Sequence, residues 1–224
     1  MNISIKDVLY KVRYFFIPYL IVLCACLILK ILFTRVQIYY AVNSHNNPLA
    51  DILAPYFTDL GDGWTTIALA LILALFNYSR ALLLAVVYAV TSLSAQLVKH
   101  IFDAPRPKLY FQDQLSRIHF VKGVEIFSLH SFPSGHTVTA FSTALVITWW
   151  CRNRFLGLPL LLLAMMIGYS RMYLSEHFFE DVIAGSVIGV IITVFLIRWL
   201  DSRRFMHSAR WNSGLFIKPK ERMA

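Results

Sequence analysis

The sequence has few charged residues and few cysteines. Asp, Glu, Lys and Arg make up 15% of its 224 residues, whereas hydrophobic residues make up 58% and mean hydropathy is +0.62. A soluble domain of this length could not bury so much apolar surface, which excludes an ordinary globular protein and indicates a chain embedded in lipid. The three cysteines, Cys24, Cys26 and Cys151, lie within or at the end of apolar segments, so no disulfide framework is expected.

Long hydrophobic runs recur along the chain. Because a helix needs about 20 mostly apolar residues to cross a bilayer, we predict an all-α fold, a six-transmembrane-helix bundle that forms one membrane-embedded domain. The predicted spans are residues 14–33, 63–78, 81–102, 135–151, 155–174 and 182–200. The first span is not expected to be a cleaved signal peptide, because its apolar run is too long and no small-residue cleavage site follows it.

The loops differ in charge. Lys and Arg gather in the N-terminal segment, in the turns after the second and fourth spans, and in residues 201–224. Short cytoplasmic loops carry the excess of Lys and Arg, so both termini are expected to be cytoplasmic, and residues 201–224 to form a basic cytoplasmic tail that attracts anionic lipid. Trp211 and Phe216 in this tail are spaced for contact with the membrane interface. No compact basic domain is present, so no nucleic-acid partner is expected. The Asn-x-Ser sites at Asn2 and Asn77 fall on the predicted cytoplasmic side, which favours a bacterial inner membrane.

The opposite, external face carries the remaining loops. Residues 36–62 are too polar to span the membrane, and their apolar side chains predict a short interfacial helix in the external loop after the first span. Residues 103–134 form the longest polar loop, which is typical of a functional segment. That loop is basic although it is external, and the charge rule does not explain why.

Three polar clusters fall at the external ends of predicted spans. The first is the stretch KHIFDAPRP, residues 99–107, in which Lys99 ends the third span. The prolines on either side of Arg106 hold it in extended backbone. Taken alone, this cluster is also typical of a snorkelling lysine and a solvated arginine.

The second cluster is the stretch SFPSGH at the start of the fourth span. Pro133 favours a helix start, Ser134 is a typical N-cap residue, and Gly135 allows a ligand to approach the backbone closely. The first N–H groups of such a helix form an anion site. His136 stands in this first turn, although an ordinary capped helix with an interfacial histidine would show the same residues.

The third cluster is the stretch SRMYLSEHFFED, residues 170–181. Arg171 lies near the external end of the fifth span, and His177 and Asp181 are four residues apart. On a helix that spacing places both on one face, where Asp181 would accept the Nδ1–H of His177 and leave Nε2 free as a nucleophile or base. Glu176 and Glu180 are offset from that face and are expected to be solvated or to interact with the helix dipole. An ordinary pair of residues at a helix start is the alternative.

In the six-span arrangement all three clusters meet at one membrane face. Arginine, lysine and helix N–H groups favour a doubly charged oxyanion, and cations stabilise a phosphoryl group during transfer. The sequence offers no catalytic thiol and no evident serine–base pair, so a histidine held by an aspartate is the best nucleophile, with the second histidine as acid. A zinc site of His136, His177 and Asp181 is the chemical rival, but the neighbouring cations would repel a divalent ion.

These residues carry a family resemblance. The chain resembles the type-2 phosphatidic acid phosphatase superfamily of integral membrane lipid phosphatases, which shows the motifs K-x6-RP, PSGH and SR-x5-H-x3-D. Here they read, in family order and without a gap, Lys99–x6–Arg106–Pro107, Pro133–Ser134–Gly135–His136 and Ser170–Arg171–x5–His177–x3–Asp181.

The resemblance implies a role for each motif residue. His177 would attack phosphorus and form a phosphohistidine, Asp181 would orient His177, and His136 would protonate the leaving oxygen and then activate water. The phosphate would be held by Lys99, Arg106, Ser134, Gly135 and Arg171. The family implies no metal and no cofactor.

The substrate is expected to be a membrane lipid phosphate whose head reaches the external interface while its tail stays in the bilayer. A polyprenyl diphosphate, phosphatidylglycerol phosphate, phosphatidic acid and a lipid A phosphate all fit. Two alternatives remain open: a lipid-to-lipid phosphotransferase with the same intermediate, and a non-enzymatic lipid or anion transporter. The absence of an inverted repeat in the sequence argues against the transporter.

Overall fold

The structure, a computed structural model, describes residues 3–218, and those residues contain helices and loops but no strand. The α-helices are α1 (Ile5–Lys11), α2 (Arg13–Leu32), α3 (Arg35–Asn43), α4 (Pro48–Leu60), α5 (Gly63–Phe76), α6 (Tyr78–Phe102), α7 (Pro107–Tyr110), α8 (Gly135–Trp150), α9 (Gly157–Tyr173) and α10 (Phe179–Asp201). Three short 3-10 helices cover Gln112–Arg117, Arg154–Leu156 and Arg204–His207. The prediction of an all-α fold is therefore confirmed.

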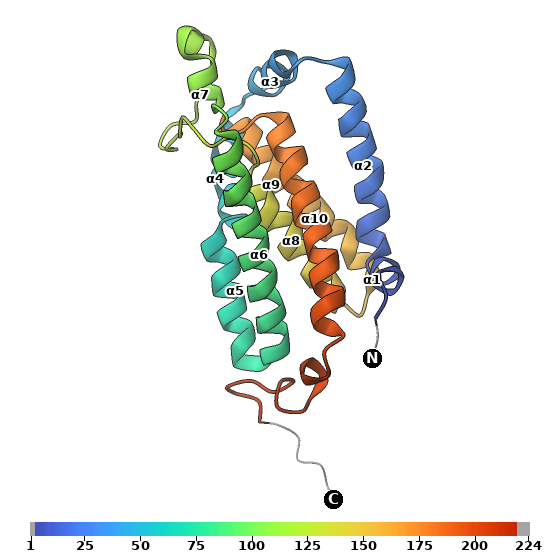
Figure 1. The fold of residues 1–224 in the computed structure, drawn as a ribbon. Helices are drawn as coiled ribbons and strands as arrows, with labels where there is room; N and C mark the ends of the chain where they lie inside the picture. Colours follow the sequence, from blue (N-terminus) through green and yellow to red (C-terminus); the bar gives the residue numbers. More distant parts are fainter. Residues whose placement is uncertain (1–2, 219–224) are drawn as a thin grey trace, which may run out of the picture.

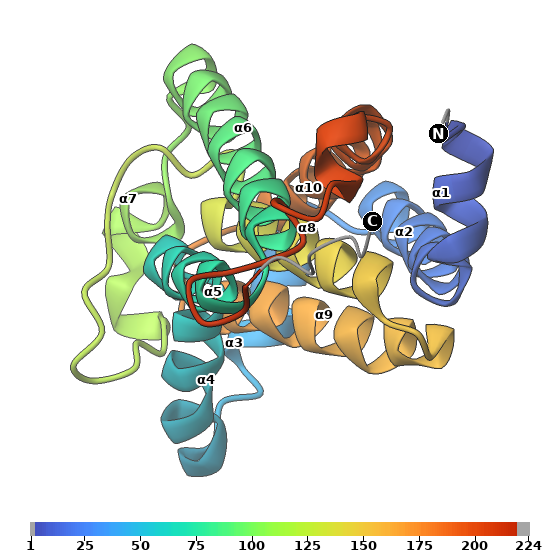
Figure 2. The same ribbon diagram turned by 90° about the horizontal axis from the view of Figure 1, so that it is seen from below.

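The helices form an elongated bundle with α8 in its middle. α8 packs against α6, α9 and α10, and α5 pairs with α6 (Figures 1 and 2). Eleven residues of the sixteen-residue helix α8 are buried, which marks it as the core helix. α1 and the segment after α10 lie at one end of the bundle, and α3 and α7 lie at the other (Figure 1).

Helices occur at all six predicted span positions, but their lengths differ. By length and composition the described residues contain four candidate spans, which include α2, α6, α9 and α10. The pair α4 and α5, bent by 50°, makes a fifth if it is counted as one span. α8 has 16 residues and α5 has 14, fewer than the roughly 20 that a span needs. In the segment 36–62, where the sequence predicts one short helix, the structure has α3 and α4.

Two glycines on α10 allow it to approach α8 closely. A Cβ at Gly185 would lie 2.7 Å from the Ser134 carbonyl oxygen, and a Cβ at Gly189 would lie 2.7 Å from that of Val138. Small residues four apart are the usual means by which membrane helices bring their backbones together. As a consequence the start of α10 lies beside the start of α8, where the second and third polar clusters meet.

The loop between α6 and α8 folds back over this end of the bundle. The Arg106 amide donates to the Ser128 carbonyl at 2.8 Å, and the Ser131 amide donates to the Ala104 carbonyl at 2.9 Å. Phe111 and Ile118 in the loop belong to a buried cluster that includes residues from α3 and the start of α10. The loop is thereby fixed over the polar clusters.

The segment after α10 packs under the turn between α5 and α6. The Tyr78 amide donates to the Ser213 carbonyl at 2.8 Å, and the Phe216 amide donates to the Leu75 carbonyl at 2.8 Å. This part of the predicted tail is therefore held against the bundle. Lys220 and Arg222, which belong to the predicted basic tail, lie outside the described residues.

Candidate active site

The first cluster brings two cations to the end of α6. Lys99 lies in the last turn of α6 and is buried. Asp103, in the left-handed conformation at φ 37°, ends the helix. Arg106 follows in extended backbone, as the flanking prolines predict, and its Nε donates to the Leu129 carbonyl at 2.9 Å. Arg106 is also buried, so neither cation is the solvated side chain that the alternative interpretation required.

The second cluster forms the start of α8. Ser134 occupies the N-cap position, as the sequence predicts, but its side chain accepts from the Thr137 hydroxyl at 2.9 Å and makes no capping bond within residues 3–218. The first turn of α8 therefore keeps backbone donors that no described side chain caps. The Lys99 amine faces this turn, 3.9 Å from the place where a Cβ of Gly135 would lie. A helix start beside a buried ammonium group offers the donors and the charge that an anion site needs.

His136 stands at the open side of the same turn. Its Nε2 lies 3.5 Å from the Asp62 carboxylate at the start of α5, and its side chain is 27% exposed. His177, by contrast, has a side chain that is only 1% exposed. The two histidines therefore differ in their access to water, which suits one to protonate a leaving group or activate water and the other to bond to phosphorus.

The third cluster places a histidine against an aspartate, but not on one helical face. His177 precedes α10, and Asp181 occupies the third position of the helix, from which its carboxylate reaches back. Asp181 Oδ2 accepts the Phe178 amide at 2.8 Å and the Ser131 hydroxyl at 2.5 Å. His177 Nδ1 lies 3.4 Å from the same oxygen. The two side chains therefore lie close together, and the cap at the start of α10 explains this better than an i, i+4 ridge does. That Asp181 accepts the Nδ1–H of His177 stays a prediction.

Ser131 was not singled out as a site residue by its sequence pattern. Its hydroxyl donates to the Asp181 carboxylate and lies 3.5 Å from His177 Nδ1. The side chain is fully buried, and it comes from the loop that folds over the site. The sequence signal was weak, because a serine two residues before Pro133 is typical of any turn.

His177 lies inside a positively charged surround. Burial lowers the pKa of its imidazole well below the ordinary value, and three nearby cations lower the pKa further. Those cations are Arg106, Arg171 and Lys99. The imidazole is therefore neutral near pH 7, which is the form that can act as a nucleophile.

Arg171 lies in the last turn of α9 and points into the same space. Its Nη1 donates to the Thr58 hydroxyl at 2.8 Å, and its Nη2 lies 3.4 Å from the Glu176 carboxylate. Its Nε is buried and has no hydrogen-bond partner within residues 3–218. A buried donor of this kind is costly unless a ligand satisfies it.

The prediction that Glu176 is solvated or interacts with the helix dipole is wrong. The sequence pattern places it in solvent or beside the helix dipole, but its side chain is 1% exposed and is paired with both Arg106 and Arg171. The turn between α9 and α10 directs it inward, and a buried carboxylate requires such partners. Burial raises the pKa of the Glu176 carboxyl from its ordinary value, and the guanidinium groups of Arg171 and Arg106 oppose that rise. Glu180, the other offset acid, pairs instead with Lys30 and Arg35 on the outer side.

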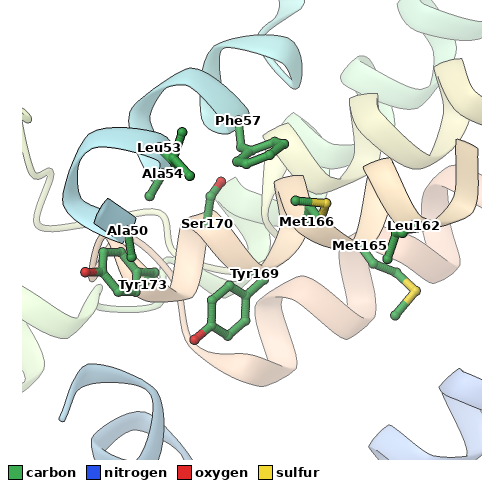
Figure 3. A pocket seen from close by; sticks show the side chains of 10 residues that line it. All are labelled: Ala50, Leu53, Ala54, Phe57, Leu162, Met165, Met166, Tyr169, Ser170 and Tyr173. Carbon is green, nitrogen blue, oxygen red and sulfur yellow. The ribbon is translucent and has the colours of Figure 1, made fainter. Parts of the chain in front are cut away.

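An apolar pocket of about 360 Å³ lies between α4 and α9 (Figure 3). Leucine, methionine and aromatic side chains line it, and Ser170 is among its few polar residues (Figure 3). The Ser170 hydroxyl lies 3.0 Å from that of Thr58, which accepts from Arg171. A short chain of hydroxyl groups therefore connects an apolar surface to the cationic site.

The described residues thus bring the predicted site residues to one place. Lys99, Arg106, Arg171 and the start of α8 face the pair His177–Asp181, and we refer to this arrangement as the phosphate cage. Within residues 3–218 no group of three or more His, Cys, Asp or Glu side chains is placed to hold a metal ion.

Comparisons with known proteins identify the family of this chain. A sequence profile of the PAP2 superfamily matches residues 80–205, which contain all three motifs. The chain is 25% identical to undecaprenyl-diphosphatase BcrC of Bacillus subtilis over 174 residues, which are 75% of this chain and 85% of that protein. It is 25% identical to a lipid A 4′-phosphatase of Porphyromonas gingivalis over 203 residues, 81% of this chain and 83% of that protein.

Among solved structures, LpxE of Aquifex aeolicus is similar to this fold. It superposes with a TM-score of 0.64 at 27% sequence identity, covering 73% of this chain and 94% of that one. The apolar helices and these membrane phosphatase relatives together identify an integral membrane protein. The chain belongs to the PAP2 superfamily, and the two relatives from Bacillus subtilis and Porphyromonas gingivalis are lipid phosphatases.

Proposed function

We propose that the protein is a lipid phosphatase that removes the terminal phosphate from a lipid phosphate or diphosphate through a phosphohistidine on His177. The observation that carries this proposal is the buried, neutral His177 held beside Asp181 and surrounded by three cations. Neutral imidazole supplies the nucleophile, and the cations stabilise the negative charge on the phosphoryl oxygens in the transition state.

The reaction has two steps. In the first, His177 Nε2 forms a bond to phosphorus, the bond from phosphorus to the lipid oxygen breaks, and His136 donates a proton to that oxygen. In the second, His136 takes a proton from water, the water oxygen bonds to phosphorus, and the P–N bond breaks to release inorganic phosphate. Asp181 keeps the Nδ1 side of His177 as a donor, so that Nε2 carries the lone pair that attacks phosphorus and recovers it when the P–N bond breaks.

The phosphate is held during both steps by groups from three helices and from the α6–α8 loop. Lys99, Arg106 and Arg171 supply positive charge, and the Gly135 amide with Ser134 supplies the start of α8. The buried Nε of Arg171 is one donor that a phosphate oxygen would satisfy.

We place this chemistry at the external face of a bacterial inner membrane. In that arrangement the chain crosses the bilayer six times, with α8 as a short span surrounded by its neighbours and both termini in the cytoplasm. α3 and α4 lie at the external interface. Single cysteines introduced at Lys122 and Arg154, in a background without the native cysteines, test this topology. An impermeant thiol reagent should label the first and not the second in intact cells, and the reverse result would refute the orientation.

The substrate we propose is an isoprenoid diphosphate, a glycerophospholipid phosphate or a lipid A phosphate. Undecaprenyl-diphosphatase and lipid A 4′-phosphatase are the printed activities of relatives that match most of this chain. The apolar pocket between α4 and α9 offers room for part of a lipid tail close to the cage.

The test is phosphate release from a panel of these lipids by the purified protein in detergent, with EDTA present. Wild-type protein should release inorganic phosphate, and His177→Ala should release none while its melting temperature stays close to that of the wild type. Full turnover by His177→Ala would refute the assignment. A phosphorylated lipid acceptor in place of free phosphate would show a phosphotransferase, and loss of wild-type turnover in EDTA would show a metal requirement.

A further inference from the structure

Glu176 is a buried carboxylate within the phosphate cage that the motifs do not include. It stands between Arg171 and His177, at a position that the SR-x5-H-x3-D pattern leaves open. Its amide donates to the Arg171 carbonyl at 3.0 Å, which turns the side chain inward after α9. Its carboxylate pairs with Arg106 from the α6–α8 loop and with Arg171 from α9. One acid therefore joins two cations that come from separate segments.

The charge in the cage explains why such an acid is useful. Lys99, Arg106 and Arg171 are all buried and lie close enough to repel one another. Buried like charges disfavour their own ionised forms and drive the side chains apart unless a counter-charge lies among them. The Asp181 carboxylate instead accepts hydrogen bonds from the Ser131 hydroxyl and from the Phe178 amide at the start of α10. Glu176 is the carboxylate that contacts the two guanidinium groups directly.

The same contact affects binding of phosphate. Glu176 lies on the Nη2 side of Arg171, while the Nε of Arg171 stays without a partner in the described residues. A phosphate oxygen can take that free donor while the carboxylate stays in place. The negative charge of Glu176 then lies on the far side of the same guanidinium group. This charge repels the bound phosphate and lowers the affinity of the cage for it.

We propose that Glu176 is a positioning residue that aligns Arg106 and Arg171 in the empty cage and lowers the affinity of the cage for inorganic phosphate, so that the product is released. This inference rests on the proposed phosphatase function. The aligned donors stabilise the transition state. They stabilise the bound dianionic product less, because the negative charge of Glu176 repels it.

Glu176→Gln tests the charge. The amide keeps the size of the side chain and one acceptor oxygen but removes the negative charge. Inorganic phosphate should bind to this variant about tenfold or more tightly, as a lower Kd in thermal-shift titration and a lower product-inhibition constant. Its kcat should fall because product release slows. An unchanged or weaker phosphate affinity would overturn the proposal.

Glu180→Gln is the matched control. Glu180 is the neighbouring carboxylate, and it pairs with Lys30 and Arg35 outside the cage. The same loss of charge at this position should leave the Kd for phosphate unchanged. A tenfold tightening in both variants would show a general effect of net charge and would overturn a specific role for Glu176.

Glu176→Asp tests alignment and decides the question if Glu176→Gln does not fold. Aspartate keeps the charge but withdraws it by one methylene, so phosphate affinity should stay near that of the wild type while kcat/KM falls as the arginines lose their contact. Wild-type kcat/KM in this variant would overturn the positioning role. Phosphate affinity is measured without turnover, so the two proposals can fail separately. A protein that binds phosphate but hydrolyses no lipid phosphate would refute the proposed function. The effect of Glu176 on phosphate affinity would still be decided by the phosphate titrations of its variants.

Discussion

Replacing Asp181 by Asn would keep His177 in the site but weaken the contact that orients its imidazole. Asp181 Oδ2 accepts from the Phe178 amide at 2.8 Å and from the Ser131 hydroxyl at 2.5 Å, and it lies 3.4 Å from His177 Nδ1. The asparagine oxygen can take over the first two bonds. The same oxygen faces His177 Nδ1. Because the asparagine oxygen carries no negative charge, it accepts a proton from Nδ1 more weakly and holds the tautomer that exposes the Nε2 lone pair less firmly.

The magnitude follows from the charge as well as from the tautomer. Forming the bond from His177 to phosphorus places positive charge on the ring, whose Nδ1 lies 3.4 Å from the carboxylate. A pair of unit charges about 5 Å apart is worth about 3 kcal/mol at an effective dielectric constant near 20. That energy corresponds to a rate loss of about 10²-fold. A weaker hold on the correct tautomer adds to this figure.

The assay is kcat and KM for phosphate release, with the Kd of inorganic phosphate measured separately by thermal shift. We expect Asp181→Asn to lower kcat by about 10²-fold or more while changing the Kd for phosphate far less. Asp113→Asn, at an exposed position in the α6–α8 loop, is the control and should behave as the wild type. An unchanged kcat in Asp181→Asn would remove this carboxylate from the mechanism.

Two further predictions concern the histidines. His136→Asn should slow release of a poor leaving group, such as a lipid alkoxide, by about 10²- to 10⁴-fold, whereas 4-nitrophenyl phosphate should still give a burst of nitrophenol as phosphohistidine accumulates. Absence of a burst together with equal losses for both substrates would contradict the assignment of His136 as acid and water activator. His177, whose pKa is lowered well below its ordinary value by burial and nearby cations, should stay neutral as pH falls from about 8 to about 5. ¹⁵N NMR of labelled histidines, with His177→Asn for assignment, measures this, and titration of the His177 signal near its ordinary pKa would show that the imidazole is not shielded.

Much of the site could be predicted from the sequence, because its residues stand in short segments with strong local constraints. Pro105 and Pro107 fix the backbone around Arg106, and Pro133 with Gly135 marks a helix start whose N–H groups bind anions. The predicted ends of the apolar segments then place Lys99 and Arg171 at the same end of the bundle. These inferences need only local chemistry and the direction in which each helix crosses the bundle.

The burial of Glu176 could not be predicted in the same way. Its inward direction depends on the turn that ends α9, and its stability depends on Arg106, which is 70 residues away in the chain. Helical periodicity places it off the face of His177 because it assumes a continuous helix through residues 176–181. The helix instead begins at Phe179. An acid next to a predicted catalytic histidine can therefore be either exposed to solvent or buried against arginines, and the local sequence pattern does not distinguish the two.

The start of α10 shows how the fold and the proposed chemistry share the same atoms. Asp181 caps its own helix through the Phe178 amide, and the same carboxylate oxygen faces His177. The Asp181 carbonyl in turn accepts the Ser134 amide at 3.0 Å, which joins the start of α10 to the start of α8. Because Gly185 permits that approach, the backbone that positions the proposed nucleophile also positions the proposed anion site. In the proposed mechanism, the distance between His177 and a bound phosphate would therefore be set by helix packing rather than by flexible side chains, which is the preorganisation that phosphoryl transfer requires.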